Sequence, residues 1–246
     1  MIKDIFIFLS FVVAAITASY GSPIKSIIGA KGISEIQEDG AFKNPYIADG
    51  LVAMWDIESG LEGGTWTDLI GGRTIDVSSC QIGHKELYIP RNVVIGGYCN
   101  ELTSLCTVEL VMRITGRKQN CYRFSSDTIA FHQIDWSPNN SRVRFGSFYS
   151  GQYTREYLDN TKRDFTYPFS VSIGSVNIMF YNGLSYTGSY VNFLLNNNTG
   201  NFVFDASSEM SNTGLYISSF RIYNRELTED EVQYNYSIDK ARFDLP

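Results

Sequence analysis

The sequence predicts an all-β protein in which two antiparallel sheets pack face to face, followed by one short C-terminal helix. Aromatic residues make up 14% of the 246 residues, with 16 Tyr and 16 Phe, and hydrophobic residues make up 43%. Short apolar or alternating runs rich in aromatic and β-branched residues recur along the chain, and Gly and Asn separate them. Runs of this kind are typical of strands joined by tight turns, and strands at this spacing indicate a sandwich.

The first 21 residues form a hydrophobic segment that is separate from the predicted domain. Residues 5–18 (IFIFLSFVVAAITA) are continuously apolar, and this run is shorter than the roughly 20 residues that cross a bilayer. Small residues end the run, as in a secretory signal peptide, but Asp4 cancels the basic charge of Lys3. The segment is therefore either a signal peptide or an anchor in an assembly or a membrane surface.

Residues 22–48 are predicted to form a linker, and residues 49–246 a single domain. Gly, Pro and Ser interrupt every long period in the linker, whereas the domain has the usual size of one sandwich. Residues 49–56 (DGLVAMWD) alternate and are aromatic, which predicts the first strand, and residues 107–114 (TVELVMRI) alternate in the same way. Further strands are expected at residues 128–133, 143–148, 169–173, 176–180 and 201–204.

The C-terminal end predicts a strand, a turn and a helix in that order. Apolar residues recur over residues 215–222, and residues 224–226 (NRE) form the turn. Thr228 and Glu231 match the capping box T-x-x-E, in which each side chain accepts a hydrogen bond from a free backbone amide at a helix start. A helix is expected to follow as far as about residue 242.

Both ends of the domain resemble the laminin-G-like domains of the concanavalin A-like lectin and glucanase superfamily. Residues 49–56 resemble the opening strand of that family, residues 65–72 (TWTDLIGG) the loop that follows it, and residues 221–231 (RIYNRELTEDE) the junction between the last strand and the helix. The resemblance covers about residues 49 to 243 and implies a concanavalin A-like jelly roll. Such domains mostly bind glycans or other surfaces and only sometimes catalyse.

No arrangement typical of catalysis is found in the sequence. Glycoside hydrolysis needs two carboxylates on one side of a cleft, and the nearest candidates, residues 56–58 (DIE) and 229–231 (EDE), end a strand and open a helix. His84 lies in a polar loop and His132 in a strand-like run, where a lone histidine is commonly structural. We therefore expect no catalytic residues and no enzyme activity, with a secreted glycoside hydrolase of the same fold as the alternative.

Charge and cysteine content restrict the partners further. The formal net charge is −6 without a basic patch, which argues against nucleic acid as a partner. The cysteines at positions 80, 99, 106 and 121 include no C-x-x-C pair, so their spacing argues against a zinc site. We expect buried free thiols, and two disulfides are the alternative.

No metal site is predicted, and calcium is the one cofactor that the resemblance leaves open. Laminin-G-like domains often bind one calcium ion through carboxylates and backbone carbonyls. The candidate ligands are Asp68, Asp76, Asp127, Asp135 and Asp205. None belongs to a D-x-D-x-D-G loop, and a single Asp is commonly a turn or cap residue. The ligands of such an ion therefore remain unassigned.

Residues 134–167 are polar, aromatic and poor in predicted strands, and we place the predicted ligand-binding site there. Exposed aromatic rings stack on flat ligands, and loops concentrate functional residues. The candidate residues are Trp136, Asn139, Arg144, Tyr149, Tyr153 and Arg155. The alternative is that the tyrosines pack on the sheet and the arginines are solvated.

The sequence thus predicts a non-catalytic binding or adhesion module, with carbohydrate as the expected ligand. We expect it to be secreted or displayed on a bacterial surface, or to belong to a bacteriophage particle. Its partners would be a glycan or surface polymer and, in an assembly, neighbouring structural subunits. A purely structural subunit that binds no glycan is the remaining alternative.

Overall fold

The computed structural model describes residues 44–102, 106–115, 121–126, 129–137, 140–149, 152–153, 156–157, 167–174, 177–181, 184–188, 199–206 and 214–246. The predicted N-terminal hydrophobic segment, residues 1–21, and the predicted linker up to residue 43 lie outside these residues. In the described part of the chain, no helix combines the length and the apolar composition needed to span a membrane.

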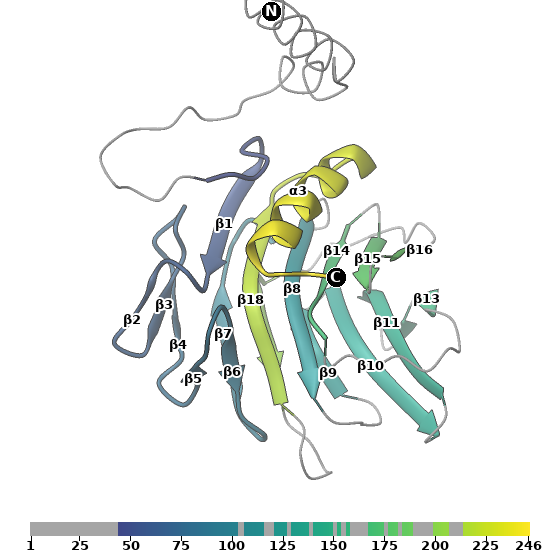
Figure 1. Cartoon of the computed structure of the whole chain (residues 1–246), viewed down its shortest axis with the longest axis horizontal. Helices are drawn as coiled ribbons and strands as arrows, with labels where there is room; N and C mark the ends of the chain where they lie inside the picture. The colour runs from purple at the N-terminus through teal and green to yellow at the C-terminus, as the bar shows by residue number, and fades with distance from the viewer. Residues whose placement is uncertain are drawn as a thin grey trace, which may run out of the picture.

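The first of two large sheets holds eight strands in the described part of the chain. They are β1 (Leu51–Asp56), β5 (Gln81–Ile82), β6 (Leu87–Ile89), β8 (Thr107–Thr115), β14 (Phe169–Ile173), β15 (Asn177–Tyr181), β16 (Leu184–Gly188) and β18 (Gly214–Tyr223). Their order is β16-β15-β14-β8-β18-β6-β5, and β1 pairs with β18 (Figure 1). Every pair in this sheet is antiparallel.

The second large sheet holds seven strands among the described residues. They are β7 (Val94–Tyr98), β9 (Cys121–Ser126), β10 (Ile129–Ser137), β11 (Asn140–Tyr149), β12 (Gln152–Tyr153), β13 (Glu156–Tyr157) and β17 (Asn201–Asp205). Their order is β12-β11-β10-β9-β17-β7, with β13 paired to β11. A small third sheet holds β2 (Leu61–Glu62), β3 (Thr65–Thr67) and β4 (Thr74–Asp76).

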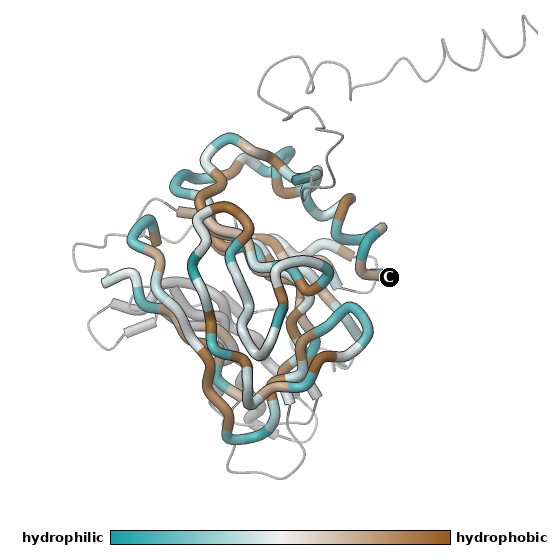
Figure 2. Tube along the Cα trace, turned by 90° about the vertical axis from the view of Figure 1, so that its left-hand side faces the viewer, coloured by the Kyte–Doolittle hydropathy of each residue, from teal (hydrophilic) through white to brown (hydrophobic). Residues whose placement is uncertain are grey.

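The two large sheets enclose an aromatic core to which both ends of the domain contribute. Trp55 of β1 lies opposite Phe220 of β18 in the strand register, and their rings stack with centroids 5.1 Å apart. Phe202 and Phe204 of β17 and Phe124 of β9 meet these rings from the other sheet. Hydrophobic and hydrophilic residues alternate along several of the coloured strands in Figure 2, and the buried hydrophobic residues of these strands form the core. The predicted all-β, two-sheet antiparallel jelly-roll sandwich is confirmed.

The expectation that residues 134–167 are poor in strands is wrong. β10 extends to Ser137, β11 begins at Asn140, and the two strands pair along almost their whole length. β12 and β13 lie further along the same segment and pair with β11. Composition misled the prediction because an outer strand tolerates polar residues at alternate positions once a neighbouring strand satisfies its backbone.

The predicted C-terminal helix is present as α3 (Glu229–Arg242), which lies across the outer face of the eight-stranded sheet (Figure 1). Its capping box is formed as predicted: the amide of Glu231 donates to Thr228 Oγ1 at 3.3 Å, and the amide of Thr228 donates to the Glu231 carboxylate at 2.9 Å. The residues that α3 buries are Val232, Asn235 and Asp239. Two of these are polar, so the helix docks largely through hydrogen bonds and ion pairs.

Replacing Thr228 with Ala is expected to lower the free energy of unfolding by about 1 kcal/mol, because the first turn of α3 loses its hydroxyl acceptor. Urea denaturation followed by circular dichroism measures this. Thr187→Ala, at an exposed position of β16, is the control and should change stability by less than about 0.5 kcal/mol. Equal effects from both substitutions would show that the cap contributes nothing.

Three of the four cysteines are free thiols: Cys80, Cys99 and Cys106. The side chain of the fourth, Cys121, lies outside those described. Two disulfides would use all four cysteines, so that alternative is excluded; Cys99 and Cys106 are buried as predicted, whereas Cys80 is half-buried. Burial raises the pKa of Cys80 to about 11 and that of Cys99 to about 12, which keeps both thiols protonated and unreactive at neutral pH.

Candidate functional site

The backbone brings four of the six predicted ligand-binding residues to one edge of the seven-stranded sheet. Trp136 lies on β10, where the pairing with β11 shifts register, and Arg144 and Tyr149 lie on β11 itself. Tyr153 lies on β12. The other two predicted residues, Asn139 and Arg155, lie outside the described residues.

The strand register divides these residues between the two faces of the sheet. Arg144 and Tyr149 are five positions apart on β11, so they lie on opposite faces. Tyr153 pairs with Phe148, four positions from Arg144, and therefore shares the face of Arg144. The backbone supports a common surface for Arg144 and Tyr153 and places Tyr149 on the other side.

A second group of polar and aromatic residues, which the sequence interpretation did not single out, lies on the eight-stranded sheet. Gln81, Tyr88, Tyr216 and Arg113 occupy one cross-strand row over β5, β6, β18 and β8. Cross-strand partners share a face, and this is the outer face because the next residue of β18, Leu215, is fully buried in the core. We call these four residues the tyrosine row.

The aromatic rings of the tyrosine row form a stack. The centroids of Tyr88 and Tyr216 are 4.7 Å apart with planes inclined by 30°. On the β8 side, the guanidinium carbon of Arg113 lies 3.4 Å from the centroid of Tyr216. β5 lies on the far side of β6 from β18, so the exposed Gln81 is the cross-strand neighbour of Tyr88 on the side away from Tyr216.

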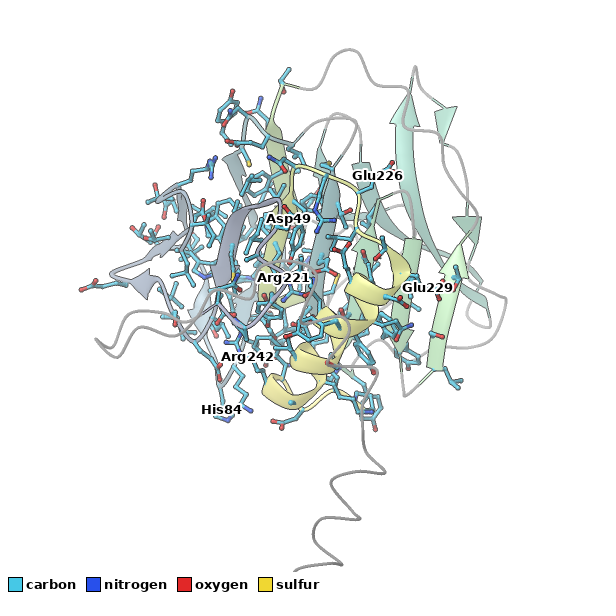
Figure 3. The ribbon with its side chains drawn as sticks, turned by 90° about the horizontal axis from the view of Figure 1, so that it is seen from above. Asp49, His84, Arg221, Glu226, Glu229 and Arg242 are labelled. Carbon is cyan, nitrogen blue, oxygen red and sulfur yellow. The ribbon has the colours of Figure 1, made fainter. Side chains whose placement is uncertain are left out.

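Glu86 fixes the arginine at the end of the stack. Its two carboxylate oxygens accept from Nε and Nη2 of Arg113 at 2.7 and 2.6 Å, a bidentate geometry. The hydrogen bonds that Arg113 donates to Glu86 raise the pKa of Arg113 above its ordinary value. Glu86 belongs to the turn that carries His84, which is exposed and lies on the Arg242 side of the molecule, away from Glu229 (Figure 3).

The tyrosine row combines an aromatic surface with hydrogen-bonding groups, and a flat polyhydroxylated ligand requires both. Both tyrosines and Arg113 are half-buried, so an aromatic surface is accessible without rearrangement. The exposed part of the Tyr88 ring offers a stacking surface, and the amide of its strand neighbour Gln81 offers two donors and an acceptor. The arrangement suits binding, and it contains one carboxylate, Glu86, that is already paired.

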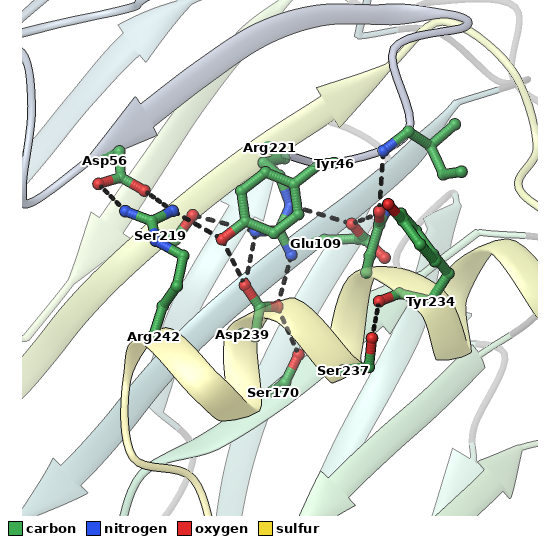
Figure 4. A network of polar contacts seen from close by, with 12 residues as sticks. Tyr46, Asp56, Glu109, Ser170, Ser219, Arg221, Tyr234, Ser237, Asp239 and Arg242 are labelled. Atoms are coloured by element: carbon green, nitrogen blue, oxygen red, sulfur yellow. Dashed lines mark hydrogen bonds and ion pairs between the residues drawn. The ribbon is translucent and has the colours of Figure 1, made fainter. Parts of the chain in front are cut away.

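A second polar cluster is buried between α3 and the sheet (Figure 4). Arg221 donates to Glu109 Oε2 at 3.0 Å and to both oxygens of Asp239 at 2.7 and 2.6 Å. Asn235 Nδ2 donates to the same Glu109 oxygen at 2.8 Å. We call this the buried arginine network.

Tyr46 covers the buried arginine network. It lies in the short arm, residues 44–50, that precedes β1. Its ring lies over the Arg221 guanidinium at 3.8 Å, and its hydroxyl donates to Asp239 Oδ1 at 2.8 Å. The amide of Ile47 donates to Asn235 Oδ1 at 3.0 Å, which fixes the arm to α3. Glu109 and Asp239 are thereby buried, and both serve as partners of Arg221 between the sheet and α3.

Four other acidic residues considered from the sequence also have structural partners: Asp56, Glu58, Asp68 and Asp76. Arg242 donates to Asp56 at 2.8 Å and to Glu58 at 2.6 Å. Asp68 accepts from the amides of Met54, Ile70 and Gly71 and from Arg73. Asp76 accepts from the amide of Ser78, as an Asp in a turn does.

Two of the calcium candidates thus have structural roles. Asp68 is engaged through both carboxylate oxygens, and Asp76 forms a turn. Asp127 lies outside the described residues, and the side chain of Asp135 is not among those described. Within the described part of the chain, no group of three His, Cys, Asp or Glu residues is arranged to hold a metal ion.

Fold and site together define an antiparallel β-sandwich of jelly-roll type with an aromatic and polar row open on one outer face. No protein-family model matches the chain, and no curated protein sequence matches it. Solved structures do match. The sialidase of Trypanosoma rangeli in complex with sialic acid superposes with a TM-score of 0.60 and 11% identity, over 78% of this chain and 33% of the sialidase chain.

Two toxin domains match equally well. The receptor-binding domain of botulinum neurotoxin type G has a TM-score of 0.59 and 15% identity, over 78% of this chain and 52% of that chain. The ligand-binding domain of botulinum neurotoxin serotype D, in complex with N-acetylneuraminic acid, has a TM-score of 0.58 and 14% identity, over 77% and 51%. This chain therefore corresponds to a third to a half of these proteins, and the likeness is one of fold.

Proposed function

We propose that this protein is a non-catalytic carbohydrate-binding module of the laminin-G-like, concanavalin A-like type. The observation that carries the proposal is the tyrosine row, in which the stacked, half-buried rings of Tyr88 and Tyr216 share one cross-strand row with the exposed Gln81. An aromatic ring stacks on the apolar face of a sugar, and a neighbouring amide bonds its hydroxyls. The sialidase and the serotype D domain are both described in complex with a sialic acid, which supports carbohydrate as the class of ligand.

The positions of the described carboxylates favour a binding function without catalysis. Retaining and inverting glycosidases both need two carboxyl groups that flank the scissile bond. Glu109 and Asp239 are close partners of one arginine but are buried beneath Tyr46 and α3. Glu86, the carboxylate at the tyrosine row, is held by Arg113. None of these three is placed to act on a bound sugar.

We further propose that the module is held at a bacterial surface or on a bacteriophage particle through its N-terminal segment, with neighbouring subunits as additional partners in the second case. The arm enters β1 at Leu51, which pairs with Tyr223 at the end of β18. Tyr46 of the arm lies over Arg221, and Tyr216 lies five residues earlier on that strand, roughly 16 Å away at the rise of a strand. An attachment through the arm would therefore leave the tyrosine row at a distance from the point of attachment.

Removal of either tyrosine is expected to weaken glycan binding about tenfold, because a ring contact of this kind contributes roughly 1 kcal/mol or more. A glycan array with the full chain identifies ligands, and calorimetry with Tyr88→Ala and Tyr216→Ala measures the loss. Tyr98→Ala, at a position 55% exposed on β7 of the other sheet, is the matched control and should bind normally.

The alternatives give different results in the same assays. Loss of binding in Tyr153→Ala but not in Tyr88→Ala would move the site to the seven-stranded sheet. Release of reducing sugar from a bound glycan would identify an enzyme. A folded protein that binds no glycan on the array would contradict the proposed function and favour a purely structural subunit.

A further inference from the structure

The positive and negative charges in the tyrosine row cancel, and this restricts which glycans the row can bind. Arg113 is the cation of the row, and Glu86 neutralises it through two short hydrogen bonds. Lys85, in the turn before β6, pairs with Asp244 at 2.9 Å. The remaining members, Gln81, Tyr88 and Tyr216, are uncharged at neutral pH.

An acidic sugar would need an unpaired cation in the tyrosine row, and the cation of the row, Arg113, is already paired with Glu86. Its carboxylate would have to displace Glu86 from Arg113, which breaks a bidentate ion pair and leaves a second carboxylate at the site. The long-range field opposes the same ligand, because the formal net charge of the protein is −6. Both the local pairing and the overall charge thus disfavour sialylated or uronic acid-containing glycans.

A neutral sugar meets no such obstacle. Its hydroxyls donate to the unused lone pairs of Glu86 and to the amide oxygen of Gln81, and they accept from the amide nitrogen of Gln81. Arg113 is held by Glu86 through Nε and Nη2 and also interacts with Tyr216, and binding of a neutral sugar requires neither contact to break. The ring of Tyr88 supplies the stacking surface.

We propose that the tyrosine row selects neutral glycans and discriminates against acidic ones, in contrast to the sialic acid complexes of its structural neighbours. This inference rests on the proposed function. The Glu86–Arg113 pair is the element that sets the preference, since it cancels the charge that would otherwise attract a carboxylate. Glu86 is therefore a specificity-determining residue as well as a hydrogen-bond acceptor.

The test compares neutral probes with acidic counterparts that differ by one sugar. Lactose and 3′-sialyllactose form one such pair, and a neutral hexose oligosaccharide and its uronic acid analogue form another. For the full-length protein, we expect at least tenfold tighter binding of the neutral member. In Glu86→Gln, Arg113 loses its countercharge, so the ratio should narrow and the acidic probe should bind with a dependence on salt concentration.

The possible failures are distinguishable. Tighter binding of the acidic member, lost in Tyr88→Ala, would overturn the preference for neutral glycans and leave carbohydrate binding intact. An unchanged ratio in Glu86→Gln, with neutral probes still bound, would show that Glu86 does not set the preference. Binding of no probe and no glycan on the array, by a protein that circular dichroism shows to be folded, would overturn this inference and the proposed function together.

Discussion

Replacing Arg221 with Met is expected to lower the free energy of unfolding by about 3 to 5 kcal/mol. The side chain is 1% exposed and donates to Glu109, Asp239 and Ser219. Its loss leaves two carboxylates in a buried site without the charge that balances them, and such a site is far more costly than a missing surface ion pair. Urea denaturation of the purified variant measures the effect.

Two further variants separate this cause from simple loss of packing. Lys240→Met removes an exposed cation from the same helix, α3, and should change stability by less than about 0.5 kcal/mol. Combining Arg221→Met with Glu109→Leu and Asp239→Leu removes the orphaned charges, and should restore part of the lost stability. A triple variant less stable than Arg221→Met would contradict the explanation from unpaired charge.

Glu109 is expected to make the stability of the fold depend on pH. Burial raises its pKa to about 7, and the positive charge of Arg221 opposes that rise only in part. The cluster around it explains the direction: Arg221 and Arg242 balance Asp239 and Asp56, so an ionised Glu109 adds a negative charge without a cation of its own.

The direction of this pH dependence follows from the higher proton affinity of Glu109 in the folded state. Glu109 binds its proton more tightly when folded than when unfolded, where its pKa is near 4.5. Its contribution is therefore complete below pH 4.5, decreases as the pH rises toward 7, and is lost above that value. The loss should be about 3 kcal/mol.

Glu109→Gln isolates this contribution, because other carboxylates act in the opposite sense. Arg225, for example, holds the pKa of Glu231 below its usual value through hydrogen bonds. The difference in unfolding free energy between the parent protein and Glu109→Gln, measured from pH 4.5 to 8, should shift steadily in favour of the variant. Glu226→Gln, an exposed substitution beside α3, should show no such trend. A constant difference for Glu109→Gln would contradict the assignment.

Protonation of Glu109 should also change the local stability of the N-terminal arm. Tyr46 contacts Arg221 and Asp239 directly, and Asn235 links the arm to Glu109. Hydrogen exchange at the amide of Ile47 is therefore expected to be slower at pH 6 than at pH 8, after correction for the intrinsic rate. Glu109→Gln should abolish the corrected difference.

Features encoded by neighbouring residues could be predicted from the sequence. The capping box of Thr228 and Glu231 and the start of α3 depend on residues three positions apart, and both were predicted correctly. The strands that contain Trp55 and Phe220 follow from local alternation of apolar residues, which is sufficient to indicate a sandwich. The strand predicted at residues 143–148 is present within β11, but the end of β10 and the short strands β12 and β13 are not predicted, because local composition does not reveal that a partner strand satisfies the backbone.

The tyrosine row and the buried arginine network were decided by the tertiary structure. Gln81 and Tyr216 meet in one row although more than a hundred residues separate them, and Arg221 bonds Glu109 at a separation of 112 residues. Such pairings depend on the register between distant strands, and a shift of one residue would turn every side chain to the opposite face. The period of a strand is local, whereas its register is set by packing against the rest of the fold.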